Sequence, residues 1–437
     1  MAPMASCFFH KKRLDPDSFR KSPPERSGID YRLSILEHRS EPTRTRRNQL
    51  LSRGWTLYYL GGQRQGIRWK FLAVQRYNDT IMRIGILTSG GDCPGLNAVL
   101  RGVIKAAEKR GWQVIGFLDG FEGLLPPVRH IVLDHSRTSG IMKQGGTMLG
   151  TSSRGHFVAK VGAGERTQVP AEIIEKVRQT LGDLEINGLI VVGGDGSLTT
   201  ALQLQEAGFS IIGVPKTIDN DLEATSMTFG FDSAVACVTD ALDRLHSTAT
   251  SHKRVMVLEV MGRHAGWIAL FGGIAGEANI ILLPKIPFEW EKVADAVRQR
   301  DADGYKCTLI VVSEGAKPKD GEESHHLSTH GEYRLGGIGE IVTAEVAERT
   351  GKESRCCVLG HLQRGGAPTP LDRLLGTQFG LKAVQLIAEG KFGTMVSYQN
   401  NEVLDAPIAD AVHRLRLVDP THQLVETARE IGISFGD

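Results

Sequence analysis

The sequence is poor in aromatic residues and contains no long apolar run. Aromatic side chains make up 6% of the 437 residues, and no stretch of 18 consecutive apolar residues occurs. We therefore expect no transmembrane helix and no membrane partner. The six cysteines show neither CxxC nor Cys/His metal-site spacing; they are Cys7, Cys93, Cys237, Cys307, Cys356 and Cys357. This usage indicates reduced thiols in a cytoplasmic protein rather than a disulfide framework.

Excess positive charge is confined to the first 81 residues. They hold 16 lysines and arginines against seven aspartates and glutamates, whereas residues 82–437 hold 36 against 43. The body therefore lacks the basic footprint of a nucleic-acid-binding protein. Residues 1–81 show no sustained apolar periodicity and no apolar segment of a secretory signal. We expect them to be a basic, disordered extension, or an upstream stretch included by a mis-assigned start before Met82.

From Met82 onward, short apolar runs alternate with amphipathic segments. Runs rich in Val, Ile and Leu predict strands within 82–91, 113–120, 188–197, 210–217, 254–261, 279–286 and 306–315. Segments 96–110 and 338–349 keep apolar residues at helical spacing. The alternation is typical of βαβ units around a mostly parallel sheet. In such sheets ligands bind at the carboxyl ends of the strands, which is where this sequence gathers its glycines and aspartates.

Two glycine-rich segments follow predicted strands. TSGGDCPGLNAVLRG (88–102) leads from a strand through a glycine pair into a helix. Such a turn suits phosphate oxygens because backbone amides approach the anion closely, although a tight structural turn would look the same. IVVGGDGSL (190–198) sets Asp195 among three glycines. A carboxylate there can hold the Mg²⁺ of a nucleotide, and a helix-capping aspartate is the alternative.

A third segment and a scattered set of cations complete the candidate chemistry. VPKTIDNDL (214–222) carries Asp219 and Asp221. A carboxylate at this place can accept the proton of an attacking hydroxyl, whereas an Asx-turn is the plainer interpretation. Four arginines and one histidine form a scattered set: Arg254 and Arg263 lie at the two ends of the predicted strand 254–261, and Arg355 precedes the segment 358–366, which holds His361 and Arg364. Because arginine binds phosphate through paired hydrogen bonds, this set together with Glu314 predicts a sugar-phosphate pocket.

In their order and spacing these segments resemble the 6-phosphofructokinase family. The resemblance covers about residues 82–415 and is carried by SGGDCPGLNAVLRG, GGDGSL, PKTIDND, SHKRVMVLEVMGRHAG, VVSEG and LGHLQRGG. It implies an α/β fold of two doubly wound Rossmann-like lobes with mostly parallel sheets and the active site in the cleft between them. Residues 82–230 plus about 363–415 would form the nucleotide-binding lobe, and 231–362 plus about 416–437 the sugar-phosphate-binding lobe. The implied reaction is the ATP-dependent phosphorylation of fructose 6-phosphate in glycolysis, with Mg²⁺.

The resemblance also implies roles for individual residues. Asp219 would be the base on the sugar 1-hydroxyl, and the other catalytic residues would be Thr217, Arg263 and Gly90. The nucleotide contacts would be Gly90, Ser153, Arg154, Gly194, Asp195, Gly196 and Ser197, with Asp195 holding the metal. The contacts to fructose 6-phosphate would be Thr217, Ile218, Asp219, Arg254, Met261, Gly262, Arg263, Glu314, Arg355, His361 and Arg364. Because Arg254 and Arg355 match residues that reach the sugar phosphate from a neighbouring subunit, a homo-oligomer, tetramer or dimer, is implied.

Two positions bear on the phosphoryl donor. Relatives that use ATP usually carry glycine where this chain has Lys216, and relatives that use pyrophosphate carry aspartate where it has Gly196. A carboxylate at position 196 would crowd and repel an α-phosphate, whereas the lysine excludes nothing. We therefore expect a nucleotide donor, with pyrophosphate as the alternative.

Regulation and other functions are less well supported. Only Arg101 and Lys105 resemble part of the family's effector site, and Asp303 and Tyr305 stand where basic residues are expected, which puts allostery in doubt. A catalytically silent paralogue is disfavoured by intact Asp195, Thr217, Asp219 and Arg263. A kinase acting on NAD or a lipid is disfavoured by the VPKTIDND and GHLQRGG segments.

Overall fold

The structure, a computed structural model, describes residues 55–64, 67–76, 81–152, 155–157, 168–327 and 333–437. The chain divides into two units, Met1–Asp79 and Thr80–Asp437. Among the described residues, none of the helices combines the length and apolar character needed to cross a bilayer.

The described residues of the first unit form an antiparallel hairpin. Its strands are β1 (Trp55–Arg64) and β2 (Ile67–Arg76), paired from Trp55 opposite Arg76 to Arg64 opposite Ile67. The sequence pattern does not predict these two strands, and the rest of the expected extension, residues 1–54 above all, lies outside the described residues. An isolated two-stranded hairpin is marginally stable in water, so these two strands alone do not make a stable domain.

The larger sheet of the second unit has seven strands. They are β3 (Arg83–Thr88), β4 (Gln113–Phe117), β5 (His130–Leu133), β6 (Ile186–Gly193), β7 (Ile211–Pro215), β14 (Thr394–Gln399) and β15 (Glu402–Pro407). Their order in the sheet is β15-β14-β7-β6-β3-β4-β5. The central five are parallel, and β5 and β15 pair antiparallel at the two edges.

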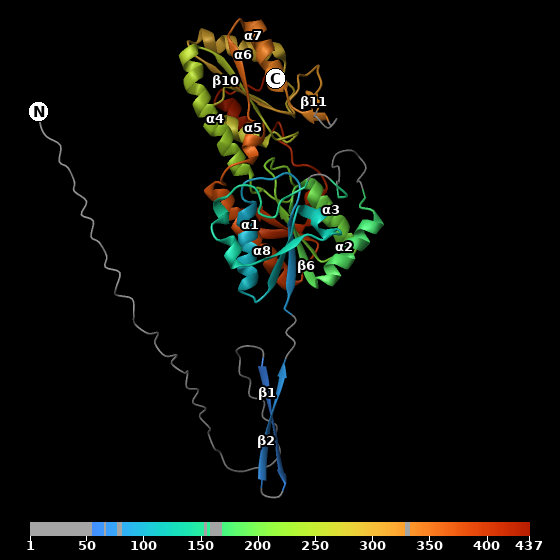
Figure 1. Ribbon diagram of the computed structural model, residues 1–437. Coiled ribbons are helices and arrows are strands. Elements are labelled where there is room, and N and C mark those ends of the chain that lie inside the picture. The colour runs from blue at the N-terminus through green and yellow to red at the C-terminus, as the bar shows by residue number, and fades with distance from the viewer. Residues whose placement is uncertain (1–54, 65–66, 77–80, 153–154, 158–167, 328–332) are drawn as a thin grey trace, which may run out of the picture. The chain divides into compact units, whose positions relative to one another are not determined.

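Helices cover this sheet on both faces. They are α1 (Leu96–Glu108), α2 (Ala171–Asp183), α3 (Asp195–Glu206), α8 (Pro370–Glu389) and α9 (Ile408–Val412), with short 3₁₀ turns at Gly120–Leu124 (η1), His135–Thr138 (η2) and Ile141–Lys143 (η3). Figure 1 shows α1 and α8 on one side of β6 and α2 and α3 on the other.

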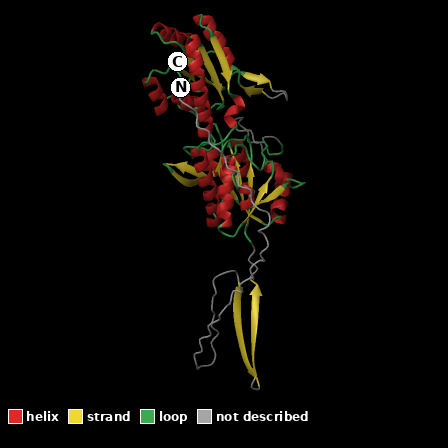
Figure 2. Ribbon diagram, turned by 60° about the vertical axis from the view of Figure 1, so that its left-hand side comes forward, coloured by secondary structure: helices red, strands yellow, loops and turns green. Residues whose placement is uncertain are grey.

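The smaller sheet has four parallel strands. They are β8 (Val255–Val260), β9 (Ile280–Leu282), β10 (Thr308–Ser313) and β13 (Ser354–Val358), in the order β13-β8-β10-β9. Its helices are α4 (Phe231–His252), α5 (Trp267–Ala275), α6 (Trp290–Ala302), α7 (Ile338–Thr350) and α10 (Gln423–Glu430), with a 3₁₀ turn η4 at Gly360–Arg364. A small hairpin of β11 (His325–Leu327) and β12 (Tyr333–Leu335) lies between β10 and α7 in the sequence. The strands of both sheets lie between helices (Figure 2).

Both faces of the central strands of each sheet are buried, which explains their continuous apolar runs. In β6, Ile190 and Val192 pack with α1 and α8, whereas Leu189 and Val191 pack with α2 and α3. Alternate side chains of a strand point to opposite faces, so a strand covered on both sides must be apolar throughout. The seven predicted strand regions each contain an observed strand, and both predicted helices are present. The predicted fold class, two doubly wound α/β lobes with mostly parallel sheets, is therefore confirmed.

Candidate active site

Three neighbouring strands of the larger sheet end at the same edge. Thr88 of β3 lies opposite Val192 of β6, and Gly193 of β6 lies opposite Pro215 of β7. The segments that leave these strands are therefore adjacent: 89–95 leads into α1, Gly194 leads into α3, and 216–222 follows β7. The three motifs singled out in the sequence meet here, as the parallel topology predicts.

The first of these segments turns sharply at Gly90. Gly90 has φ +80°, and a Cβ there would lie 3.2 Å from Ser197 Oγ and 3.5 Å from Lys216 Nζ. Its N–H donates to Ser152 O at 3.1 Å, and Thr151 Oγ1 donates to its carbonyl at 2.6 Å. Only glycine fits this crowded left-handed position, so the backbone of the loop is held close to the start of α3.

The side chain of Lys216 contacts this loop. Its side chain is buried, and its ammonium group donates to the carbonyl of Gly91. Burial lowers the pKa of Lys216, and the neighbouring Arg364 acts in the same direction. The lysine therefore holds the loop that follows β3 by its backbone, a contact that cannot be predicted from the position of Lys216 in the sequence.

Asp219 and Asp221 are buried close to one another after β7. Asp219 is 3% exposed and Asp221 2%, and one carboxylate oxygen of each (Oδ1) has no hydrogen-bond partner among the described protein groups. Burial and the charge of Asp219 raise the pKa of Asp221 to about 7. Thr217 Oγ1 accepts the N–H of Asp219 at 3.1 Å, which fixes the start of the turn. A buried carboxylate oxygen without a partner is energetically unfavourable, and a ligand hydroxyl could satisfy it.

The smaller sheet supplies the opposing side of the site. Met261, Gly262 and Arg263 follow β8, and Glu314 follows the adjacent β10. Glu314 Oε1 accepts the N–H of Gly262 at 3.2 Å and that of Arg263 at 2.9 Å. Burial raises the pKa of Glu314 to about 7 in spite of these hydrogen bonds. Arg263 has φ +47°, a left-handed backbone conformation that this carboxylate helps to hold.

Arg263 joins the two lobes. Its Nη1 lies 3.3 Å from Asp195 Oδ2, and its Nε lies 3.8 Å from Asp219 Oδ2. Partial burial of Arg263 disfavours its charged form. The nearby carboxylates of Asp195, Asp219 and Asp221 favour that form more strongly, so the pKa of Arg263 is raised. One guanidinium thus contacts the aspartate that opens α3 and the aspartate that follows β7, although both lie far from it in the sequence.

A second arginine reaches the larger lobe from the turn after β13. Arg364 Nη1 donates to Asp92 O at 3.1 Å, and a Cβ on Gly91 would lie 2.9 Å from the same nitrogen. His361, in the same turn η4, is exposed. Arg364 therefore packs against the loop that follows β3, next to the carbonyl of Gly91 that Lys216 binds.

The structure does not bring Arg254 and Arg355 into this group. Arg254 precedes β8 and lies seven residues before Met261, which corresponds to about 23 Å at ~3.3 Å per residue. Arg355 pairs with Met256 near the same end of the sheet. Both arginines form ion pairs with Glu353, at 2.8 Å for Arg254. Within one chain these two cations therefore lie at the amino ends of the strands, opposite Arg263. Ser153 and Arg154 lie outside the described residues.

No protein cluster of three or more His, Cys, Asp or Glu side chains suited to a metal occurs in the described part of the chain. Asp195 nevertheless fits a nucleotide-borne cation. It is the first residue of α3, its side chain is 18% exposed, and no side chain caps the helix. A magnesium ion that carries nucleotide phosphates keeps several water ligands and needs only one or two carboxylates.

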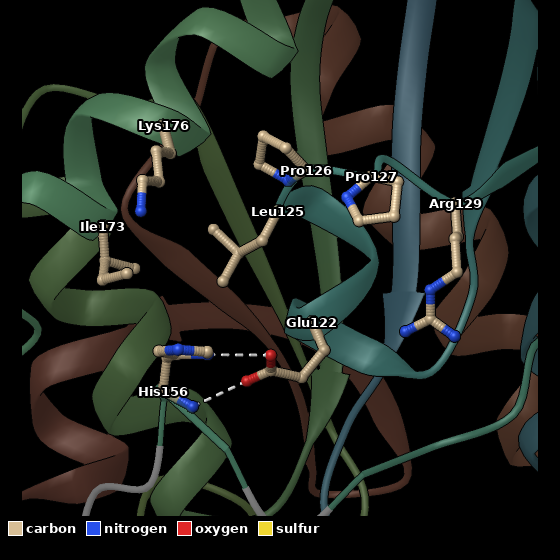
Figure 3. A pocket seen from close by; sticks show the side chains of 8 residues that line it. All are labelled: Glu122, Leu125, Pro126, Pro127, Arg129, His156, Ile173 and Lys176. Carbon is tan, nitrogen blue, oxygen red and sulfur yellow. Dashed lines mark hydrogen bonds and ion pairs between the residues drawn. The ribbon is translucent and has the colours of Figure 1, made fainter.

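A cavity is lined by residues of η1 and α2 and of the segments beside them (Figure 3). It has a volume of about 350 Å³. The residues that line it are Glu122, Leu125, Pro126, Pro127, Arg129, His156, Ile173 and Lys176. Its charged groups are largely paired within the protein, because Glu122 accepts from the backbone and the ring of His156 and Arg129 pairs with Asp119. None of the described residues predicted for the active site lines this cavity.

Comparisons with known proteins identify the family of the chain. Residues 83–387 match the phosphofructokinase family. The chain belongs to that family. It is 50% identical over 357 residues to an ATP-dependent 6-phosphofructokinase of Chloroflexus aggregans, covering 81% of this chain and 98% of that protein. It is also 46% identical over 360 residues to a pyrophosphate–fructose 6-phosphate 1-phosphotransferase of Amycolatopsis methanolica, covering 81% of this chain and 100% of that protein. The resemblance noted in the sequence is thus confirmed.

Solved phosphofructokinase structures share the fold. The structure of phosphofructokinase from Saccharomyces cerevisiae superposes with a TM-score of 0.65 at 28% identity, covering 80% of this chain and 47% of that one. The chain thus spans about half the length of the yeast protein. The pyrophosphate-dependent phosphofructokinase of Nitrosospira multiformis superposes with a TM-score of 0.67 at 24% identity, covering 82% and 93%. The second likeness concerns the fold alone.

Proposed function

We propose that this phosphofructokinase transfers the terminal phosphoryl group of ATP to the 1-hydroxyl of fructose 6-phosphate. The observation that carries the proposal is the buried Asp219, whose Oδ1 lacks a partner among the described groups and whose Oδ2 lies 3.8 Å from Arg263 Nε. A base that removes a hydroxyl proton needs a free carboxylate oxygen, and the reaction needs a fixed cation for the charge that develops on the phosphoryl group.

In the proposed reaction the residues of the candidate active site have different roles. Asp219 takes the proton of the attacking hydroxyl, and Thr217 holds the backbone of Asp219. Arg263 stabilises charge on the transferred phosphoryl group, and the N–H groups of the first turn of α3 face the donor phosphates. Asp195 would hold Mg²⁺, which when bound neutralises the phosphate oxygens. The remaining proposed contacts to the sugar phosphate are Ile218, Met261, Gly262, Glu314, His361 and Arg364.

The donor is the part of the proposal that the relatives leave open, because names with ATP and with pyrophosphate both occur among them. Two features favour ATP. Gly196 places no carboxylate in the first turn of α3, and the ammonium of Lys216 is engaged by the carbonyl of Gly91 instead of standing free beside the donor. The test is an assay of the purified chain with fructose 6-phosphate and Mg²⁺, offered ATP, ADP or pyrophosphate in turn. Higher kcat/KM with ATP supports the proposal, and a tenfold preference for pyrophosphate refutes it.

We further propose that the unit Thr80–Asp437 carries the whole activity. The motifs and both large sheets belong to it, and the hairpin of the first unit contributes no proposed site residue. A chain of residues 82–437 should keep a specific activity within about twofold of the full chain, measured with the same assay. If the truncated protein is insoluble or loses its oligomeric state, the first unit supports the fold and this part of the proposal is wrong.

We propose a homo-oligomer, tetramer or dimer. Two of the arginines expected to bind the sugar phosphate lie far from the candidate active site of their own chain. Arg254 and Arg355 gather around Glu353 at the amino ends of β8 and β13. Two cations held by one carboxylate leave a net positive charge there, which suits the phosphate of a sugar bound to a neighbouring subunit.

Arg355→Ala should raise the KM for fructose 6-phosphate by roughly 10- to 100-fold, since a charge-assisted phosphate contact is worth about 1.5–3 kcal/mol. Hybrid oligomers test whether the contact crosses subunits. Co-assembly of inactive Asp219→Ser chains with Arg355→Ala chains should recover activity, because a hybrid pairs an intact Asp219 in one subunit with an intact Arg355 from the other. Absence of recovery in hybrids isolated with two affinity tags would place Arg355 outside the shared site.

A further inference from the structure

A short strap near the C-terminus ties the catalytic turn to the other lobe. After α9 the chain runs through 415–418 before α10 begins at Gln423. Leu415 forms an antiparallel bridge with Leu222, and Arg416 N–H donates to Asp221 O at 2.8 Å. Two residues on, Val418 N–H donates to Ala265 O at 2.9 Å, just before α5. The strap therefore pairs on one side with the turn that carries both aspartates and on the other with the segment that follows Arg263.

The side chain of Arg416 fills the space between these two segments. Its Nη1 lies 3.4 Å from Asn220 O and 3.2 Å from Ser226 O, and donates to both carbonyls. Its guanidinium carbon lies 4.3 Å from the centroid of the Trp267 ring, and Trp267 Nε1 donates back to Arg416 O at 2.9 Å. A planar guanidinium can donate in its plane while its face stacks on an indole, which a lysine cannot do equally well.

The turn that Arg416 contacts is under strain. Asn220 adopts φ +51°, and it lies between Asp219 and Asp221 in the sequence. Its side-chain oxygen accepts the N–H of Thr228 at 3.1 Å, and Thr228 Oγ1 donates to Thr217 O at 2.7 Å. These hydrogen bonds join residues within the turn, whereas Arg416 binds the backbone carbonyls of Asn220 and Ser226. Since two buried carboxylates repel each other, the turn must be held rigidly if Asp219 is to keep one position.

We propose that Arg416 is a positioning residue for phosphoryl transfer: it holds the backbone between Asp219 and Asp221 against Trp267 and so fixes the base relative to Arg263. This inference rests on the proposed function of Asp219. Arg416 acts on backbone carbonyls and contacts no reacting group. Its contribution is orientation, and displacement of a catalytic group by about 1 Å can reduce the rate by about 10²-fold.

The test compares Arg416→Met with a control at Arg414, the residue just before the strap. Arg414 is exposed and its side chain pairs with the side chain of Glu223 at 2.9 Å. Arg414→Met therefore removes the same charge and the same number of donors beside the segment 217–228, while both backbone carbonyls bound by Arg416 keep their partner. In the full-length protein, Arg416→Met should lower kcat by roughly 30- to 100-fold with KM for fructose 6-phosphate within about threefold. Arg416→Lys, which keeps donors for the two carbonyls, should recover kcat to within about fivefold of the wild-type value. Arg414→Met should stay within about twofold.

Amide hydrogen exchange of the peptide 217–228 provides a readout that does not depend on turnover. Arg416→Met should exchange these amides faster than the wild type, and Arg414→Met should not. Unchanged kcat in Arg416→Met, an equal loss in Arg414→Met, or a loss that follows the folded fraction and is not recovered by Arg416→Lys would overturn the proposal. A wild-type chain that phosphorylates nothing would instead refute the proposed function, and unaltered exchange in Arg416→Met would then also remove Arg416 as an anchor.

Discussion

Replacement of Asp219 by serine should lower kcat by about 10²- to 10⁴-fold while the affinity for fructose 6-phosphate changes little. General-base catalysis contributes about this much, and the base that we propose is the Asp219 carboxylate, which is buried beside Arg263 with one oxygen unpaired among the described groups. Because the proposed role of the unpaired Asp219 oxygen is to accept a proton, loss of Asp219 should affect proton transfer more than binding of the sugar phosphate. Steady-state kinetics with fructose 6-phosphate and ATP measure both quantities.

The same substitution should not weaken the fold, which separates a catalytic from a structural effect. Removing the Asp219 charge relieves its repulsion with Asp221, and repulsion of this kind contributes to the raised pKa of Asp221. The thermal unfolding midpoint of Asp219→Ser should therefore equal or exceed that of the wild type. Asp240→Asn serves as a control, since Asp240 pairs with Arg244 on the surface of α4 and should leave kcat within about twofold. An Asp219→Ser variant that turns over at a near-normal rate would remove Asp219 from the mechanism.

The sequence predicts those parts of the site that depend on strand ends. A glycine or aspartate that follows an apolar strand must lie at the carboxyl edge of a parallel sheet, so the order of residues alone groups Gly90, Asp195 and Asp219. The pairing of Arg263 with Asp195 across the lobes can be expected only from the family resemblance. Periodicity describes each lobe separately and carries no information on which side chains meet between them.

Other features depend on contacts that no local pattern encodes. Lys216 stands beside Thr217 in the sequence, yet its ammonium group lies under the loop at Gly91. Arg416 lies 196 and 190 residues from the two carbonyls that it binds, in a segment without glycine or aspartate motifs. The hairpin of β1 and β2 is not predicted because the alternation of apolar and charged residues in it is confined to 67–71 and lies in a strongly basic segment without sustained apolar periodicity.

Gly196→Asp should reduce kcat/KM for ATP by at least about tenfold. Gly196 is the second residue of α3, where the helix N-terminus favours an anion and where no side chain caps the N–H groups. An aspartate at position 196 would put its own negative charge at this helix N-terminus, where the donor phosphates are proposed to bind. Two like charges about 4 Å apart repel by ~1 kcal/mol in water and by ~4 kcal/mol at an effective dielectric constant of about 20. A repulsion of ~4 kcal/mol corresponds to about a thousandfold loss of kcat/KM. The size of the measured loss therefore indicates how far water is excluded from the site.

Gly196→Asn separates charge from bulk, because asparagine has nearly the same size as aspartate and no charge. We expect Gly196→Asn to retain most of the ATP-dependent activity and Gly196→Asp to lose it, with the ratio of kcat/KM for ATP to that for pyrophosphate falling only in the aspartate variant. Lys216→Gly should change this ratio less, since the lysine is bonded to the loop and excludes neither donor. Equal losses in Gly196→Asn and Gly196→Asp would show that space, not charge, governs the donor at this position. A wild-type preference for pyrophosphate of about tenfold or more would mean that Lys216 sets the choice and that the missing carboxylate at position 196 does not.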